Sequence, residues 1–351
     1  MDVRNFIIEN IVRLLEYLKQ NPLYVYTRRS VDAYLAAYAL VASMGETAQV
    51  AVTDWPPRAG ICIGFKCDGL YITERGVGID DKFHASGFTS ISSLVASIIT
   101  SISPLEEGVH KALYIGHHSW SVDYCDYKCP LPPELARGDE QLAVVFPLAE
   151  EYPLGKALSL STLPLIPGVT GREFDLASLP ADYLAVLDWA LGVVVSEGFH
   201  TAILDKAIRH HSPAIRAATL AEKVEADMAG FVNRELETYV ASLAETFYNV
   251  VKRVKDGVVP LPNPFYVYKL PPYLSYYLKL SNWVALRYET TRGYIVALVP
   301  PHGQNARLRK IAEELSEIGQ VLEFPTHVIV YIEVGRYADF VKSFEHLNEE
   351  S

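Results

Sequence analysis

Two neighbouring arginines stand where a strand is expected to give way to a helix, near the start of the chain. Arg28 and Arg29 follow the β-rich run 23–27 and precede an Ala- and Leu-rich segment. In open α/β folds, ligands bind at the carboxyl ends of the strands. The two cations could therefore hold a phosphate without a metal ion. An ion pair with Asp32 or Asp68 would explain them equally well, and both interpretations stay open.

Histidines and cysteines supply the other candidate ligands. His117 and His118 follow a glycine, whereas a metal site built on this pair would need an acid in that position. We therefore expect the pair at a structurally neutral position near the far edge of the sheet and not at a metal. Structural zinc sites usually combine two Cys-x-x-Cys pairs, a spacing that this sequence lacks. We therefore expect ordinary buried or loop cysteines at Cys62, Cys67, Cys125 and Cys129. The alternative is a disulfide between Cys125 and Cys129, which requires a suitable turn. Intracellular proteins of hot habitats tolerate disulfides, and the 22 Tyr, 21 Pro and only 3 Met point to such a habitat.

Composition and charge limit the class of protein. The chain has 351 residues, of which 50% are hydrophobic, so it can bury a large core and two domains are expected. A formal net charge of -11 argues against a protein that coats nucleic acid through a generally basic surface. No apolar run is long enough to span a membrane, and the N-terminus has no signal-peptide pattern. We therefore expect a cytoplasmic protein that does not contact membranes.

The order of segments in the first part of the chain predicts a largely parallel sheet with helices on its faces. Apolar residues at helical spacing predict an amphipathic helix over 3–19, and Ser30 is expected to cap a helix that runs to Met44. A third helix is expected over 89–102. Four β-rich runs alternate with these helices, at 23–27, 49–53, 61–65 and 70–73.

The rest of the chain is expected to hold a long helix and a second, smaller module. Before them we expect one strand and two short helices, at 142–146, 180–197 and 201–210. Ser212-Pro213 should open a helix that reaches Val254 and connects two lobes. An α+β module follows, with strands at 265–269, 283–289, 293–299 and 327–333 and helices at 304–317 and 336–347.

The junction after the first strand resembles the first motif of the DHH phosphoesterase family. In that motif a His and two Asp residues at the strand end are followed by a glycine and a helix of small residues. The matching positions here are Arg28, Ser30, Asp32 and Ala33, so one acid remains. Two divalent cations need several carboxylates and imidazoles around them. The resemblance therefore implies that no metal is bound, because an arginine stands in the histidine position.

Two later segments resemble the next motifs of the same family, in the same order. Asp68 lies in the stretch that matches the second motif, which has an acid at the end of a strand. Glu74-Arg75-Gly76 stands where the third motif has Asp-His-His, and residues 87–96 resemble the Ser-rich helix that follows it. The resemblance makes Asp68 and Glu74 vestigial positions of a lost metal site.

The second half of the chain carries two further resemblances. Residues 162–171 are similar to a segment of archaeal RecJ-like proteins, and residues 319–326 resemble the DHH-associated domain. In active members the latter segment is a Gly-rich turn that contacts nucleic acid, whereas Leu322 and Glu323 replace glycines here. The fold implied is α/β: a parallel-sheet DHH-type domain, a long connecting helix and a smaller α+β DHH-associated domain, at 1–211, 212–256 and 257–351.

Taken together, the degraded motifs resemble an inactivated archaeal RecJ-like protein, the counterpart of the cell-division-cycle subunit of the CMG replicative helicase. This resemblance implies a non-catalytic replication subunit, without a cofactor, that binds the GINS complex and supports the MCM helicase. It leaves Arg28 and Arg29 for a weak contact with phosphate or single-stranded DNA.

Two other functions remain open on the sequence. The first is an active manganese-dependent single-strand DNA exonuclease or nucleotide phosphoesterase, with a rearranged metal site built from Asp32, Asp68, His117 and His118. The second is a nucleotide-sensing protein that has kept the cleft as a ligand pocket.

Overall fold

The computed structural model describes residues 3–20, 22–44, 48–125, 129, 131–135, 245–246 and 249–349. The chain divides into two compact units, Met1–Ser242 and Leu243–Ser351, and each is described by itself. The domain boundaries expected from the sequence remain predictions. Several predicted elements lie outside the described residues, namely those at 142–146, 180–197 and 201–210 and most of the connecting helix, and so does the segment 162–171.

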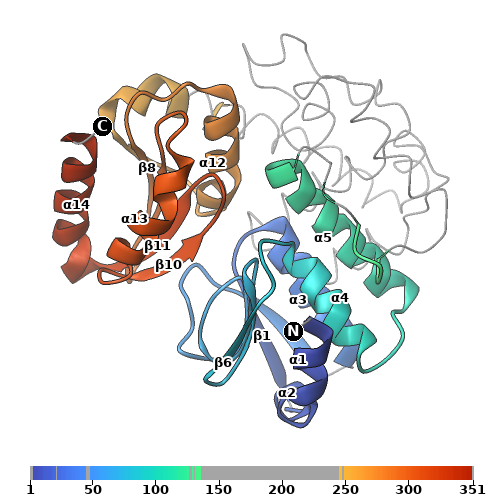
Figure 1. Cartoon of the computed structure of the whole chain (residues 1–351). Helices are drawn as coiled ribbons and strands as arrows, with labels where there is room; N and C mark the ends of the chain where they lie inside the picture. The colour runs from blue at the N-terminus through green and yellow to red at the C-terminus, as the bar shows by residue number, and fades with distance from the viewer. Residues whose placement is uncertain are drawn as a thin grey trace, which may run out of the picture. The chain divides into compact units, whose positions relative to one another are not determined.

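The first unit contains a six-stranded, mostly parallel sheet (Figure 1). Its strands are β1 (Leu23–Thr27), β2 (Ala48–Val52), β3 (Ala59–Ile63), β4 (Asp68–Thr73), β5 (Gly76–Ile79) and β6 (Lys82–Ala85). They lie in the order β2-β1-β3-β4-β5-β6. The first four are parallel, and β5 and β6 add an antiparallel hairpin. The four predicted runs are thus confirmed as strands, whereas the hairpin was not predicted.

Three helices pack together beside this sheet, namely α3 (Val31–Met44), α4 (Ile91–Thr100) and α5 (Glu107–Cys125). α3 contacts β1, β2 and β3, α4 contacts β4, and α5 packs on α3 and α4 (Figure 1). The side chains of Val31–Leu40 are all buried. Helices that are apolar all round are typical of such interior positions. The predicted helices that follow Ser30 and cover 89–102 are confirmed.

Two predictions about helices in this unit need correction. The helix expected over 3–19 is two helices, α1 (Val3–Glu9) and α2 (Ile11–Leu18). Between them, Asn10 donates its side-chain N–H to the carbonyl oxygen of Phe6 (2.8 Å), a bond of the kind that competes with the regular helix. The pair His117 and His118 lies within α5 and not at the edge of the sheet. This helix was not predicted because Gly and Ser interrupt its apolar pattern. These small residues lie where α5 approaches its neighbours closely.

The second unit contains a five-stranded mixed sheet in the order β10-β11-β9-β8-β7. Its strands are β7 (Val258–Pro260), β8 (Val284–Glu289), β9 (Gly293–Val299), β10 (Gln320–Glu323) and β11 (Val328–Glu333). Neighbours are antiparallel except for β7 and β8. The predicted strands at 283–289, 293–299 and 327–333 are confirmed. The segment 319–326 contains β10, a strand that was not predicted.

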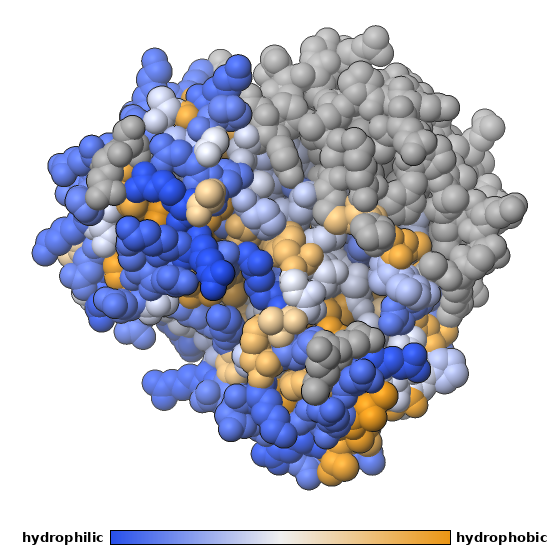
Figure 2. Space-filling view, viewed as in Figure 1, coloured by the Kyte–Doolittle hydropathy of each residue, from blue (hydrophilic) through white to orange (hydrophobic). Residues whose placement is uncertain are grey.

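Helices cover both faces of this second sheet. α13 (Leu308–Leu315) and α14 (Tyr337–Glu349) confirm the predicted helices at 304–317 and 336–347, and short 3-10 turns, η4 (Asn305–Arg307) and η5 (Val334–Arg336), precede them. They close one core, in which Phe340 of α14 packs with inward side chains of the strands such as Val296 and Val330. The face of the unit seen in Figure 2 is mostly hydrophilic.

The other face of the second sheet is covered by a helix that the sequence predicted as a strand. α12 (Phe265–Tyr277) contacts β8 and β9, and the hydroxyl groups of Tyr268 and Tyr331 are hydrogen-bonded (2.6 Å). The aromatic and β-branched residues at 265–269 favour a strand by propensity alone. Asn263 overrides them, because its side-chain oxygen accepts the N–H of Phe265 (2.9 Å) and Pro264 suits the start of a helix.

No helix among the described residues has the length and the apolar character needed to cross a bilayer.

Candidate functional site

The carboxyl ends of three neighbouring parallel strands meet around one buried arginine in the first unit. Thr27 at the end of β1 is aligned with Ile63 at the end of β3, which is aligned in turn with Ile72 of β4. Arg28, Gly64 and Glu74 therefore emerge from the same edge of the sheet. This edge is where open α/β folds place their ligand sites, and Arg28 is only 3% exposed there.

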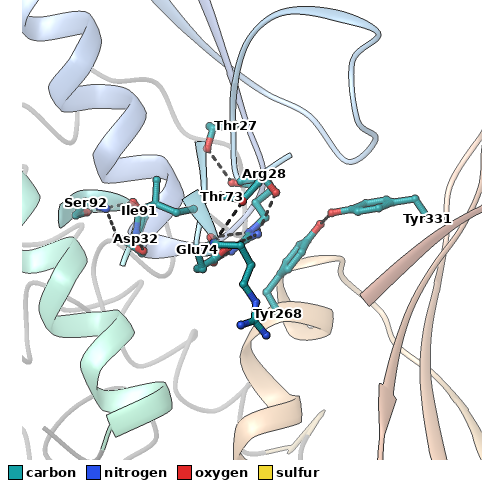
Figure 3. A network of polar contacts seen from close by, with 12 residues as sticks. Thr27, Arg28, Asp32, Thr73, Glu74, Ile91, Ser92, Tyr268 and Tyr331 are labelled. Atoms are coloured by element: carbon teal, nitrogen blue, oxygen red, sulfur yellow. Dashed lines mark hydrogen bonds and ion pairs between the residues drawn. The ribbon is translucent and has the colours of Figure 1, made fainter. Parts of the chain in front are cut away.

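The guanidinium of Arg28 is held by groups from all three strand ends (Figure 3). Its Nε donates to Oγ of Ser30 (3.2 Å), and one Nη donates to the carbonyl oxygen of Gly64 (3.0 Å). Both Nη atoms also donate to the carboxylate of Glu74. From the sequence, either Asp32 or Asp68 could be the ion-pair partner of Arg28. In the structure the partner is a different acid, Glu74.

Gly64 is what lets the arginine lie across the end of β3. Its φ of +83° belongs to the region that glycine adopts freely. A Cβ atom at this position would lie 3.0 Å from two carbon atoms of the Arg28 side chain. Sequence reasoning missed this residue, although a lone glycine directly after an apolar run is a signal for such a close approach.

Asp32 is buried beside the arginine but bonds to a different element. Its carboxylate accepts the backbone N–H groups of Ile91 (2.7 Å) and Ser92 (2.9 Å), at the start of α4 (Figure 3). Burial raises the pKa of Asp32 to about 7; nearby Glu74 adds to the rise, and the hydrogen bonds from Ser92 and Ile91 oppose it. Asp32 therefore binds the first backbone N–H groups of α4.

His117 belongs to a neighbouring polar cluster inside the helix layer. Its Nδ1 lies 2.8 Å from Oγ of Ser90 and 3.0 Å from Oγ of Ser93. Burial lowers the pKa of His117 to about 4, so the ring is neutral at pH 7. Its Nε2 is buried and has no hydrogen-bond partner among the residues that the structure describes. The structure thus brings His117 to the start of α4, in the segment that resembles a Ser-rich helix. The side chain of His118 is not among those that the structure describes.

Two predicted site residues lie away from this arrangement. Asp68 begins β4 and is exposed, at the end of that strand opposite to Glu74, so it does not stand at a carboxyl end as the second-motif match required. Arg29 is partly exposed and pairs with Asp54. Arg28 is buried and bonded to Ser30, Gly64 and Glu74, and the phosphate contact of Arg28 and Arg29 stays a prediction.

The side chains at this edge do not fit a pair of divalent cations. Asp32 is bonded to two N–H groups of α4, and Glu74 is ion-paired with Arg28. Within the described parts of the chain, no three His, Cys, Asp or Glu side chains are grouped so that they could hold a metal ion. A fixed guanidinium also repels cations from the place where they would need to sit.

The cysteines form a disulfide at the same strands. Cys62 of β3 is bonded to Cys67, five residues later, in the segment that returns to the start of β4. Cys129 is disulfide-bonded as well. The expectation of ordinary cysteines is therefore wrong at Cys62, Cys67 and Cys129, and the pairing of Cys62 with Cys67 was not predicted. Oxidised Cys62 and Cys67 supply no thiolate, which removes them as zinc ligands.

Two basic residues of α13 form ion pairs along the helix. Arg309 lies 3.4 Å from Glu313 and Lys310 lies 3.5 Å from Glu314, each four residues apart and well exposed. Such pairs are typical of a solvated helix surface.

Comparison with known proteins gives likenesses of fold at low sequence identity. No protein-family model matches this chain, and no curated protein matches it. RecJ from Thermus thermophilus, in complex with Mn2+, is similar with a TM-score of 0.43 and 12% identity, over 99% of this chain and 55% of RecJ. CDC45 from Entamoeba histolytica is similar with a TM-score of 0.37 and 10% identity, over 99% of both chains. This chain thus spans about half the length of that RecJ.

Proposed function

We propose that this chain is a non-catalytic binding protein built on a RecJ-like α/β scaffold. One observation carries the proposal: the buried guanidinium of Arg28 lies among the strand ends, bound to Ser30, Gly64 and Glu74. Hydrolysis of a phosphodiester by a two-metal centre needs carboxylates and imidazoles at such a place, open to two cations. The guanidinium of Arg28 in that position supports a structural role for this edge of the sheet.

Hydrolysis and metal content test the proposal together. We expect the purified chain, incubated with Mn2+, to degrade neither a single-stranded DNA oligonucleotide nor bis-p-nitrophenyl phosphate. Metal analysis after dialysis should find no tightly held divalent ion. Hydrolysis that requires manganese and is lost in Asp32→Ala would overturn the proposal in favour of an active exonuclease or phosphoesterase.

The binding role that we infer is that of a subunit of an archaeal replication assembly. The order of the degraded motifs supports this role. The expected partners are the GINS complex and the MCM helicase, with at most a weak contact to single-stranded DNA. A pull-down of purified GINS and MCM with the tagged chain should recover at least one of them. Recovery of neither would overturn the replication role and leave the inactive cleft unaffected.

A nucleotide sensor is the remaining alternative, and thermal unfolding separates it from the proposal. Ligands that bind only the native state raise the melting temperature. We expect millimolar ATP, GTP or cyclic dinucleotide to leave the melting temperature unchanged, because Arg28 is already engaged. A rise that disappears in Arg29→Ala would favour the sensor.

A further inference from the structure

The first two helices carry apolar side chains on the side that faces solvent. α1 and α2 pack on the first unit through buried side chains, among them Phe6, Ile7 and Leu14. Amphipathic helices of globular proteins normally keep their opposite side polar. Here, however, Ile8 is 54% exposed and Val12 is 71% exposed. Figure 2 shows apolar side chains gathered at the bottom of the view, where Figure 1 places α1 and α2.

Four of these apolar side chains form a second stripe, here called the outer stripe: Ile8, Ile11, Val12 and Leu15, all exposed or partly exposed. The helical hydrogen bonds continue across the junction of α1 and α2. The backbone N–H of Asn10 donates to the carbonyl oxygen of Phe6 (3.2 Å), and its own carbonyl oxygen accepts the N–H of Leu14 (2.9 Å). Residues three and four apart are neighbours on a helix, so the outer stripe is continuous. Apolar residues at this spacing are what a second helix packs against.

A basic residue stands at each end of the outer stripe. Arg4 lies one helical turn before Ile8, and Lys19 lies one turn after Leu15. Both basic side chains are exposed, and neither forms an ion pair with any residue that the structure describes. The chain as a whole carries a formal net charge of -11, so the two ends of the stripe differ in sign from its average. Their charges are available to a partner.

Charge selects among the occupants that such a stripe could take. A second copy paired along the stripe would bring like charges together, because Arg4 would meet Lys19 in an antiparallel pair and its own copy in a parallel pair. An anionic lipid surface or a nucleic acid would meet the exposed carboxylates of Glu9 and Glu16 on the same helices. A helix with an apolar stripe and one acidic residue at each end of it meets neither repulsion.

We propose that the outer stripe binds an amphipathic helix of a partner protein, which places one carboxylate opposite Arg4 and another opposite Lys19. Apolar side chains three and four residues apart would pack between these two ion pairs. The proposal rests on the binding role inferred above and names a surface for it. It uses no group of the cleft around Arg28, so its failure would leave the non-catalytic reading of that cleft in place.

A model helix tests the apolar part of this surface. The probe is the fluorescein-labelled peptide acetyl-EAQALQALLQALQAQE-amide, which as a helix repeats the spacing of the outer stripe between two terminal glutamates. Titration with the full chain should give saturable binding by fluorescence anisotropy. Val12→Ser should weaken this binding at least fivefold. The matched control is Val334→Ser in the second unit, which changes an apolar residue of similar exposure (60%) and should alter binding less than twofold.

A second pair of variants tests the two charged ends. Arg4→Gln combined with Lys19→Gln should weaken binding of the peptide at least fivefold. The control is Arg309→Gln combined with Lys310→Gln, which removes the same charge from an exposed helix of the second unit and should change binding less than twofold. A peptide with lysine in place of both terminal glutamates should bind the wild type more weakly. Raising the salt concentration from 50 to 300 mM should weaken binding of the parent peptide.

Four results would overturn the proposal. Two of them come from the titrations, namely the absence of saturable binding and equal losses in a variant and its matched control. In sedimentation, a dimer that Val12→Ser dissociates would assign the outer stripe to a second copy of the chain. Binding to phosphatidylglycerol vesicles without binding of the peptide would assign it to a lipid surface.

Discussion

The pair of Arg28 and Glu74 is the residue-level feature on which the first unit depends. Both side chains are almost completely buried, at 3% and 4% exposure. Removing one partner from such a pair leaves an uncompensated charge in the interior, which costs far more than the pair itself gains. The arginine also bonds to Ser30 and to the carbonyl oxygen of Gly64, so its loss leaves several polar groups without a partner.

Arg28→Ala should therefore lower the free energy of unfolding by about 3–5 kcal/mol. Arg28→Met combined with Glu74→Gln should recover most of that loss, because no charge is left behind. The control is Arg29→Ala, which breaks the more exposed pair with Asp54 and should cost at most about 1 kcal/mol. Urea denaturation followed by circular dichroism measures all three. Similar losses for Arg28→Ala and Arg29→Ala would contradict a special role for the buried pair.

Two buried groups of the first unit should make stability depend on pH in opposite directions. The pKa of Asp32 is raised by burial from 3.8 to about 7, so its contribution to stability is present below pH 4 and is lost as pH rises to 7. The pKa of His117 is lowered by burial from 6.5 to about 4, so its contribution is present above pH 6.5 and is lost as pH falls towards 4. Over this range the two effects largely cancel.

Single substitutions should expose each effect. Between pH 7 and pH 4.5, the melting temperature of His117→Gln should rise relative to that of the wild type, because only Asp32 still titrates. The melting temperature of Asp32→Asn should fall relative to the wild type over the same range. A divergence of at least about 5 °C in each case is expected, since 1 kcal/mol shifts the melting temperature by roughly 2–4 °C in a domain of this size. Parallel curves for the three proteins would contradict the assignment.

At the scale of elements, the connection between β3 and β4 is unusually short. The two strands are parallel, yet only residues 64–67 join them, whereas parallel strands normally need a crossover of a dozen or more residues. The disulfide between Cys62 and Cys67 ties the returning segment to β3. The same segment carries the carbonyl oxygen of Gly64 that Arg28 bonds. The disulfide thus supports the polar cluster as well as the connection.

Cys67→Ser should destabilise the first unit by about 2 kcal/mol, the loop-closure estimate for a bond across so few residues. Cys62 is completely buried and Cys67 only partly, so the substitution at Cys67 removes the bond with the smaller loss of packing. Unfolding in urea should show the loss without reductant, and the difference between the wild type and the variant should disappear when both are treated with dithiothreitol, which also reduces the bond at Cys129. A wild type that dithiothreitol leaves unchanged would contradict this role.

The elements that the sequence predicted correctly are those in which local pattern and tertiary position agree. Buried and more exposed residues alternate along β1, and the apolar residues of α13 lie on one side of the helix. Both patterns are visible in the sequence. α12 and α5 were not predicted as helices because residues outside each segment, and not its own pattern, determine its conformation. Asn263 starts a helix in a run that favours strands, and α5 is buried between other helices and needs no apolar stripe. The hairpin of β5 and β6 was too short to stand out.

The candidate site was predicted in part, for a similar reason. Arg28, Ser30, Asp32 and Glu74 are all placed at or near one edge of the sheet, as their positions after strands suggested. The bonds of Arg28 with Glu74 and of Asp32 with Ser92 could not be read from the sequence, because they join residues 46 and 60 positions apart. Asp68 was expected at the end of a strand. It lies at the beginning of β4 instead, because the connection from β3 to β4 is short.

At the scale of the whole molecule, the second unit should fold without the first. It has its own sheet, covered on one face by α13 and α14 and on the other by α12, and a completely buried Trp283 within its core. A fragment of Leu243–Ser351 should therefore unfold cooperatively in urea, with native-like circular dichroism. Phe340→Ala in this fragment should lower the free energy of unfolding by about 3–5 kcal/mol, because it empties the centre of the core. Lys342→Ala, on the exposed side of α14, is the control and should leave the midpoint nearly unchanged. A broad transition that Phe340→Ala does not shift would mean that the fragment has no core of its own and that the two units fold only together.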